Sequence, residues 1–175
     1  MAEFRFIGKE GAQELHDFVH PIWSEVFGPM VTGGPAEAEY IFSRWLSAEN
    51  IVKDMDSGTS YAYFAEGDRK LGFLAFRIEG ERFFISKCYL SKNERGKGLG
   101  SEMLRMMLEY GKEHGCTSAY LHVNTNNAAA IKAYLRNGFS VDYHEIGDQG
   151  NGFATNDYVM SRSLGHPPVT STESA

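Results

Sequence analysis

The feature that most constrains this chain is a glycine-rich basic loop between an apolar, strand-like run and an amphipathic segment. The run covers residues 83–90, and Arg95-Gly96-Lys97-Gly98-Leu99-Gly100 follows it closely. Backbone N–H groups at the start of a helix have no partner within the helix and lie at the positive end of its dipole. The three glycines let an anion approach this backbone, and Arg95 and Lys97 add two positive charges. The stretch predicts an anion site of the kind that holds phosphate. A tight strand-to-helix turn without a ligand is the alternative.

The residues that follow the loop predict a helix and then a strand. Apolar side chains recur at helical spacing after Gly98, at Leu99, Met103, Met106 and Tyr110. They mark one face of a helix that ends near Gly115, and residues 118–123 then form a compact apolar strand. A strand, a helix and a second strand in this order predict a crossover between parallel neighbours.

The rest of the chain supplies further strands and helices around this unit. Residues 4–7 predict a short first strand, and glycine–proline breaks divide residues 12–53 into at least two helices. Three aromatic and aliphatic runs, the last of them residues 83–90, are separated by turns at Gly67 and Gly80, which predicts an antiparallel meander. Two more strands are expected near the C-terminus.

Length and composition predict one globular domain. The chain has 175 residues, of which 42% are apolar, and no apolar run approaches the roughly 20 residues of a membrane span. The formal charge of −6 argues against nucleic acid and mildly favours a cationic small molecule, although it also serves solubility. We expect the domain to cover residues 1–164 and the polar, proline-started stretch 165–175 to be a disordered tail.

The two cysteines and the first residues of the chain bear on its location. Cys88 and Cys116 belong to no CxxC pair or Cys/His cluster, so neither a disulfide framework nor a metal site is expected. The first residues show no signal-peptide pattern. A cytoplasmic protein without membrane association fits these observations best.

A second informative stretch runs from Asn127 to Phe139. Asn127 is well placed as an N-cap, three alanines favour a helix, and Gly138 is suited to a left-handed C-cap. Local helix chemistry does not explain Tyr134, a phenol in the middle of a short helix. Core packing is its ordinary role.

Together the two stretches resemble the signature of the GNAT superfamily, the acyl-CoA-dependent N-acyltransferases. Residues 95–100 match its R/Q-x-x-G-x-G/A pyrophosphate loop, and Asn127-x-x-Ala130-x-x-x-Tyr134-x-x-x-Gly138-Phe139 matches its later helix motif. The resemblance spans roughly residues 3–164. It implies a single α/β (α+β) GNAT-type domain: a mixed, mostly antiparallel sheet of about seven strands, splayed between strands 4 and 5, with about four flanking helices.

The resemblance also implies a cofactor site for acetyl-CoA, the co-substrate, with no metal. The strand before the loop would pair with the pantetheine arm and donate an N–H group to the thioester oxygen. The loop would hold the pyrophosphate, Asn127 would bond the pantetheine, and Arg136 would reach a phosphate. The implied binding residues are Cys88, Tyr89, Leu90, Arg95, Gly96, Lys97, Gly98, Leu99, Gly100, Ser101, Asn127 and Arg136.

Direct transfer of an acetyl group needs a base for the amine and an acid for the leaving thiolate. Tyr134 matches the family position whose hydroxyl can protonate the sulfur, so it is the implied catalytic residue. Several family members carry a glutamate on the strand before the loop, but Phe84 and Ser86 stand there in this chain. The base stays open between a water chain and four side chains, each more often structural: Glu79, Glu81, Tyr89 and His122.

The acceptor is hardest to predict. In this family the N-terminal helices and the last two strands form its wall, and Trp23, Phe27 and Tyr40 are aromatic there. The C-terminal strands resemble those of bacterial polyamine acetyltransferases, but Thr155 and Asn156 depart from them. Acidic residues that suit a cationic acceptor lie nearby, at Glu145, Asp148 and Asp157; a solvated acidic loop is the ordinary explanation.

The resulting prediction is a cytoplasmic transferase that moves an acetyl group from acetyl-CoA to a primary amine of a small molecule, with a polyamine as one candidate. One alternative is acetylation of a protein or peptide amine. The other is a non-catalytic acyl-CoA-binding sensor. Dimers are frequent in this family, so a homodimer is compatible with the resemblance.

Overall fold

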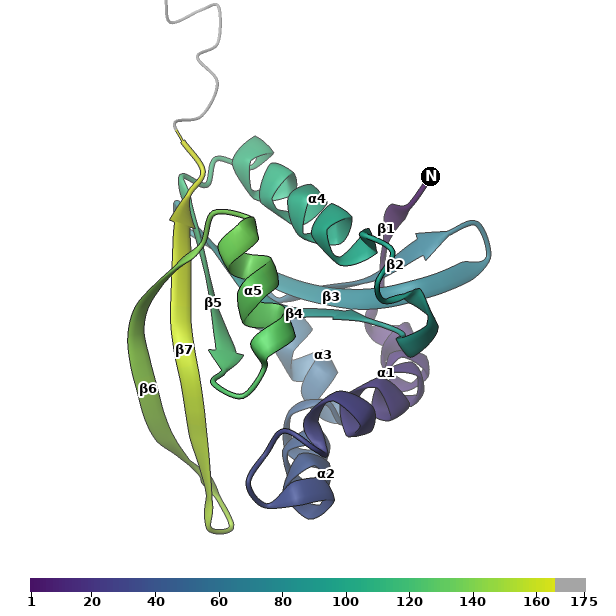
Figure 1. Cartoon of the computed structure of the whole chain (residues 1–175). Helices are drawn as coiled ribbons and strands as arrows, with labels where there is room; N and C mark the ends of the chain where they lie inside the picture. The colour runs from purple at the N-terminus through teal and green to yellow at the C-terminus, as the bar shows by residue number, and fades with distance from the viewer. Residues whose placement is uncertain (166–175) are drawn as a thin grey trace, which may run out of the picture.

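The computed structural model describes residues 1–165 and consists of a seven-stranded mixed sheet between two groups of helices (Figure 1). The expected tail lies outside the described residues, apart from Gly165. The strands are β1 (Glu3–Phe6), β2 (Ser60–Glu66), β3 (Arg69–Glu79), β4 (Arg82–Leu90), β5 (Ser118–Asn124), β6 (Ser140–Gly150) and β7 (Phe153–Ser163). Their order across the sheet is β1-β2-β3-β4-β5-β7-β6. All neighbours are antiparallel except β4 and β5, which confirms the predicted fold class.

Within residues 1–165, five α-helices flank the sheet, where the resemblance implied about four. They are α1 (Ala12–Phe27), α2 (Gly34–Trp45), α3 (Ala48–Asp56), α4 (Leu99–Glu113) and α5 (Ala128–Arg136). The additional helix arises because Ser47 starts α3 immediately after α2: its hydroxyl accepts a hydrogen bond from the N–H of Asn50 at 3.1 Å. Short 3₁₀ turns precede α1 and follow β4.

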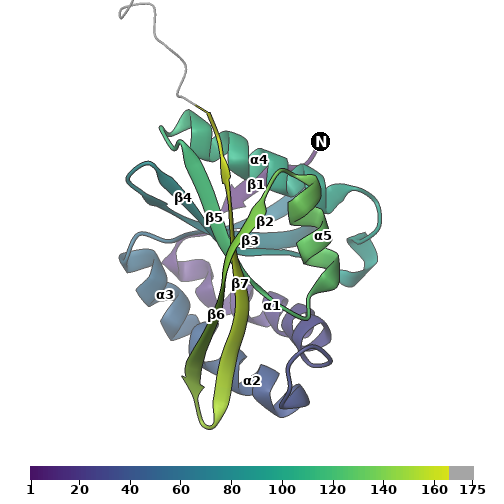
Figure 2. The same ribbon diagram turned by 60° about the vertical axis from the view of Figure 1, so that its left-hand side comes forward.

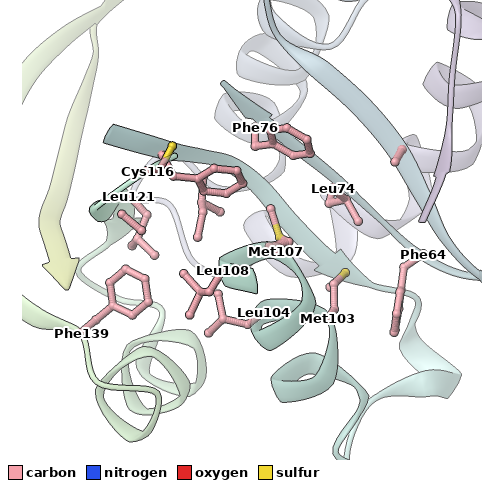
Figure 3. Packing of buried hydrophobic residues seen from close by; sticks show 14 of the residues in the cluster. Phe64, Leu74, Phe76, Met103, Leu104, Met107, Leu108, Cys116, Leu121 and Phe139 are labelled. Atoms are coloured by element: carbon pink, nitrogen blue, oxygen red, sulfur yellow. The ribbon is translucent and has the colours of Figure 1, made fainter. Parts of the chain in front are cut away.

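Alternating side chains along the strands build a core on each face of the sheet. On β2, Ala62 and Phe64 face the α4 and α5 side, whereas Tyr61 and Tyr63 face α1, α2 and α3. Figure 3 shows the first of these cores, in which leucine and methionine side chains of α4 pack on the phenylalanines of the sheet. Because both faces are covered, the central strands are apolar almost throughout, as fully buried strands are.

Helix α4 presents a slightly different face to the sheet from the predicted one. Met103 is buried as expected, but the other fully buried apolar side chains are Leu104, Met107 and Leu108. Leu99, Met106 and Tyr110 pack at the margin of the core. The predicted spacing therefore follows one edge of the buried stripe, which is wider than a single line of residues.

Strands β4 and β5 pair over only four positions and then part, as the resemblance implied. The last pair is Ile85 with Leu121, and no pairing with β5 continues along residues 86–90. A bulge lies at the same point: Phe76 on β3 pairs with Ile85 and Ala75 with Lys87, so Ser86 is the extra residue. A bulge bends a strand and increases its twist, which turns the end of β4 away from β5.

The bulge also changes which side chains face which helices. Before it, Ile85 belongs to the core under α4; after it, Cys88 and Leu90 take that side. Tyr89 packs with the α1 to α3 core. Lys87, two positions from Tyr89 on the strand, therefore shares its face.

Strands β6 and β7 form a long hairpin whose tip reaches α2 (Figure 2). The Arg44 guanidinium of α2 donates a hydrogen bond to the carbonyl of Gln149 at 2.7 Å. The rings of Tyr40 and Phe153 meet at 5.5 Å between centroids. The hairpin thus closes one side of the space between α2 and the separated ends of β4 and β5.

Candidate active site

A cavity of about 1020 Å³ passes through the opening between β4 and β5. We call its two ends the loop lobe and the hairpin lobe. The loop lobe lies on the α4 and α5 side, and the residues that line it include Cys88, Arg95, Gly96, Gly98, Gly100, Ser101, Asn127, Tyr134 and Arg136. The hairpin lobe lies on the opposite side of the sheet, and its lining includes Trp23, Phe27, Glu37, Lys87, Tyr89, His122, Glu145 and Asp157.

The loop lobe presents backbone amides to an open space. Gly96 and Gly98 have φ angles of 78° and 80°, a left-handed conformation that favours glycine, and no atom lies within 4 Å of where a Cβ would stand. In the described part of the chain, the N–H groups of residues 96–101 donate to no backbone or side-chain acceptor. The start of α4 therefore has the geometry of an anion site.

The two cations of the loop both have partners within the protein. Arg95 donates through Nε and Nη2 to the carbonyl of Leu90, at 3.2 and 3.0 Å, and its Nη2 lies 3.7 Å from Glu25 of α1. Lys97 lies 3.5 Å from Glu94 and is not part of the cavity lining. Leu99 packs on the core. Of the loop residues predicted to contact the ligand, only the glycines, Arg95 and Ser101 line the cavity.

Helix α5 brings three of the predicted residues to the same lobe. Asn127 caps the helix as expected: its side-chain oxygen accepts a hydrogen bond from the N–H of Ala130 at 3.2 Å, which leaves its amide NH₂ group for a ligand. Tyr134 lies half-buried two residues before the end of the helix, and exposed Arg136 is the last residue. Burial raises the pKa of Tyr134 well above its ordinary value, with a smaller contribution from neighbouring Cys88 and Tyr89, so its hydroxyl holds its proton.

Cys88 is close to Tyr134, in surroundings unlike those of a reactive cysteine. Burial raises the pKa of its thiol to about 12, whereas a reactive cysteine has a lowered pKa. Burial likewise raises the pKa of Tyr89, whose ring stacks on Phe73 at 5.4 Å between centroids. Both residues therefore contribute to the cavity through their backbone and their shape.

The hairpin lobe combines an aromatic wall with several charged groups. Trp23 and Phe27 of α1 stack at 4.0 Å between centroids, and buried Glu37 of α2 accepts a hydrogen bond from the N–H of Gly33 at 2.7 Å. Opposite them, His122 Nδ1 lies 3.3 Å from Oε2 of Glu145. Asp157 is half-buried, and burial raises the pKa of its carboxyl. The lobe carries more negative than positive groups, which suits a cation.

Lys87 and Glu37 are residues of this lobe that sequence reasoning missed. The Lys87 ammonium donates a hydrogen bond to the hydroxyl of Ser86 at 3.0 Å, and burial lowers its pKa. A lysine inside an otherwise apolar strand is a visible signal in the sequence. Glu37, in contrast, lies in an ordinary helical segment, and only the packing of α1 on α2 buries it.

The structure separates the candidates for the base. Glu79 accepts a hydrogen bond from the hydroxyl of Tyr120 at 2.5 Å, and Glu81 is exposed at a turn; neither lines the cavity. His122 does line it, at the first position after the last β4–β5 pair.

Residues 1–165 contain no group of three or more histidine, cysteine or acidic side chains arranged to hold a metal ion. Within the same residues, no helix has the length and apolar character needed to cross a membrane.

Comparison with known proteins agrees with the geometry of the cavity. The sequence model of the acetyltransferase (GNAT) family matches residues 17–139, and the chain therefore belongs to this family. The structure resembles a PaiA N-acetyltransferase from Thermoplasma acidophilum solved in complex with coenzyme A. The two share a TM-score of 0.74 and 17% identity, over 93% of this chain and 99% of the other.

Two curated bacterial relatives are similar over part of the sequence. The streptothricin acetyltransferase of Streptomyces lavendulae is 36% identical over 90 residues, which is 50% of this chain and 47% of that protein. The spermine/spermidine N(1)-acetyltransferase of Bacillus subtilis is 36% identical over 89 residues, 49% of this chain and 53% of the relative. The matched region thus spans about half the length of these relatives.

Proposed function

We propose that this protein is an acetyl-CoA-dependent N-acetyltransferase that acts on a primary amine of a small molecule. The observation that carries the proposal is the opening between β4 and β5, which joins unpaired amides at the start of α4 to a charged lobe across the sheet. Family membership supports the acetyl transfer, and the shape of the cavity supports a two-substrate reaction.

The loop lobe fits coenzyme A. Its open backbone above Gly96 and Gly98 would hold the pyrophosphate, with Ser101 and Arg136 beside it. The unpaired edge of β4 at Cys88, Tyr89 and Leu90 offers backbone groups to the pantetheine amides, as an added strand would. Asn127 would donate its NH₂ group to the same arm.

Tyr134 is the proposed acid. When the amine attacks the thioester, a tetrahedral oxyanion forms and the thiolate then leaves; a backbone N–H of the β4 edge would stabilise the oxyanion. A protonated phenol beside Cys88 can give its proton to the sulfur. The carbon–nitrogen bond forms and the carbon–sulfur bond breaks within one cavity, without an acyl-enzyme.

A small cationic acceptor fits the hairpin lobe better than a peptide. The β6–β7 tip is held on α2 by Arg44 and by the contact of Tyr40 with Phe153, which closes this side of the lobe. Asp157, Glu145 and Glu37 supply negative charge. The relatives named for spermine and streptothricin make polyamines and basic antibiotics the first compounds to test.

We also propose that the enzyme works in the cytoplasm, because Cys88 and Cys116 are both free. The homodimer expected from the resemblance stays a prediction.

The test is the release of thiol from acetyl-CoA in the presence of a panel of amines: polyamines, amino acids, aminoglycosides, streptothricin and peptides. We expect turnover with at least one small cationic amine. Turnover with peptides alone would favour the protein-acetylating alternative. Tight binding of acetyl-CoA without transfer to any amine would show a sensor and overturn the proposal.

A further inference from the structure

We infer that His122 is the general base that removes a proton from the acceptor amine and that Glu145 positions it. This inference rests on the proposed function. Several family members carry a glutamate on the strand before the loop, but Phe84 and Ser86 stand there in this chain, so we looked for a base on the other elements around the cavity. His122 is the candidate that the fold brings to the point where the two lobes meet.

The place of His122 follows from strand pairing. Leu121 forms the last pair with β4, and its side chain is buried toward α4. His122, the next residue, therefore faces the other way, into the hairpin lobe. Cys88 and Tyr134 line the same cavity as His122 and lie close to each other. A thioester held between the β4 edge and the Tyr134 hydroxyl would present its carbon to an amine beside His122.

Two contacts fix the imidazole ring. Phe84 meets it edge to face at 5.8 Å between centroids, and Nδ1 lies 3.3 Å from Oε2 of Glu145. A carboxylate at Nδ1 favours the tautomer with the proton on that nitrogen, which leaves the Nε2 lone pair as the proton acceptor. This is the arrangement in which a histidine acts as a base with an acidic residue orienting it.

Other groups face the same ring from each neighbouring element. Tyr120 on β5 stacks on Phe84 and lies 6.3 Å from His122 between centroids. The remaining titratable residues that line the lobe are Lys87 and Tyr89 of β4, Glu37 of α2 and Asp157 of β7. Asp157 shares the face of Glu145, its partner across β6 and β7, so it can hold the ammonium form of the acceptor next to the base.

The acceptor enters as an ammonium and gives one proton to Nε2 of His122, which passes it to water through its exposed side. The free amine forms the carbon–nitrogen bond to give the tetrahedral oxyanion, and the carbon–sulfur bond then breaks as the oxyanion collapses to the amide. The thiolate takes the Tyr134 proton, and the second proton of the nitrogen restores the phenol. The products are the amide, the thiol and one released proton.

The first measurement needs no substrate. Long-range ¹H–¹⁵N NMR of the free protein, with His122→Gln to assign the signals, reports which ring nitrogen carries the proton. We expect Nδ1 in the parent and the commoner Nε2 form in Glu145→Gln. A ring of the parent protein protonated at Nε2 would overturn the positioning by Glu145.

The second measurement is the pH dependence of kcat/KM with an amine that the parent enzyme acetylates. His122→Gln should lose about 100-fold in kcat at neutral pH, and its rate should keep rising with pH because hydroxide replaces the base. Glu145→Gln should lose about 10-fold in kcat, because the ring loses the carboxylate that orients it. The KM for acetyl-CoA should not change.

Matched controls come from the same hairpin and from α4. His144 is exposed on the other face of β6 and bonds Asn156 at 2.5 Å, and Glu109 is an exposed partner of Arg105. His144→Gln and Glu109→Gln should behave like the parent. A His122→Gln profile equal to that of the parent would overturn the inference while leaving the proposed function intact; an inactive parent protein with every amine would count against the function itself.

Discussion

The two lobes of the cavity are built in different ways. The loop lobe consists largely of backbone: amides of residues 96–101, the free edge of β4 and the first turn of α4. The hairpin lobe consists of side chains from α1, α2, β4, β5, β6 and β7. The loop lobe suits a ligand that every member of a family shares, because backbone geometry is kept when side chains change. The hairpin lobe suits a ligand that differs between members, because each side chain can change alone.

The largest effect that would test this contrast is expected from Gly98→Val. Valine is a β-branched residue that resists a φ of 80°, and its side chain would occupy the open space above the loop. We expect the affinity for acetyl-CoA to fall by about 100-fold or more, which is roughly 2.7 kcal/mol, as measured by calorimetry.

Gly115→Val controls for strain in that experiment. Gly115 has a φ of 88°, also with open space around its Cβ position, but it lies beyond the far end of α4. Its variant should lose stability and keep its affinity for acetyl-CoA. Equal affinity of the two variants would show that the loop does not hold the phosphates.

Tyr134→Phe should give the next largest effect. Removal of the hydroxyl leaves the leaving thiolate without its acid, so turnover should fall by about 10- to 1,000-fold while the affinity for acetyl-CoA stays near that of the parent. Thiol release and calorimetry measure the two quantities. Tyr110→Phe, a change at the margin of the core under α4, should alter neither. Unchanged turnover in Tyr134→Phe would remove this residue from the acid role.

The same contrast explains what the sequence could predict. Gly96, Gly98, Asn127 and Tyr134 lie in two continuous stretches whose local chemistry is visible in the order of residues. Their elements and the parallel crossover were therefore predicted correctly. The opening between the strands was implied only by the resemblance, and its physical cause, the bulge at Ser86, has no marker in the sequence.

The hairpin lobe could not be predicted in the same way. His122 and Glu145 are 23 positions apart in the numbering. They meet because the strand order β5-β7-β6 places β6 on the same side of the sheet as β5, with only β7 between them. Lys97 shows the opposite case: its place in the motif suggested contact with a phosphate, but Glu94 one turn earlier draws its ammonium away. The order of the strands in the sheet decides the first case, and a local ion pair decides the second.

Asp157→Asn should produce a smaller effect that is confined to the hairpin lobe. Loss of the carboxylate removes an attraction for a cationic acceptor, so we expect the KM for a polyamine to rise by about 10-fold and the KM for acetyl-CoA to stay unchanged. Burial raises the pKa of Asp157, so its carboxylate takes up a proton at a higher pH than an ordinary aspartate does. As the pH is lowered, the parent should therefore lose affinity for the polyamine at this higher pH. Asp142→Asn, on the exposed part of β6, is the control. Equal changes in both KM values would mean that the lobes are not separate sites.

The smallest expected effect is a gain of stability in Lys87→Met. Burial lowers the pKa of Lys87, so its charged form destabilises the folded state. At a pH below the lowered pKa, Lys87 is protonated in both the folded and the unfolded chain, and the full cost of burying its charge lowers the free energy of unfolding. At a pH above the ordinary pKa of 10.5, Lys87 is neutral in both states, and this cost disappears. Urea unfolding at pH 7 should therefore show the variant to be more stable by about 1 kcal/mol, with the difference shrinking toward pH 10. Lys132→Met, on the exposed side of α5, should change little at either pH. A variant that is less stable than the parent at pH 7 would show that the Lys87 ammonium has a compensating partner, and that the hairpin lobe is built around this cation as well as around its acids.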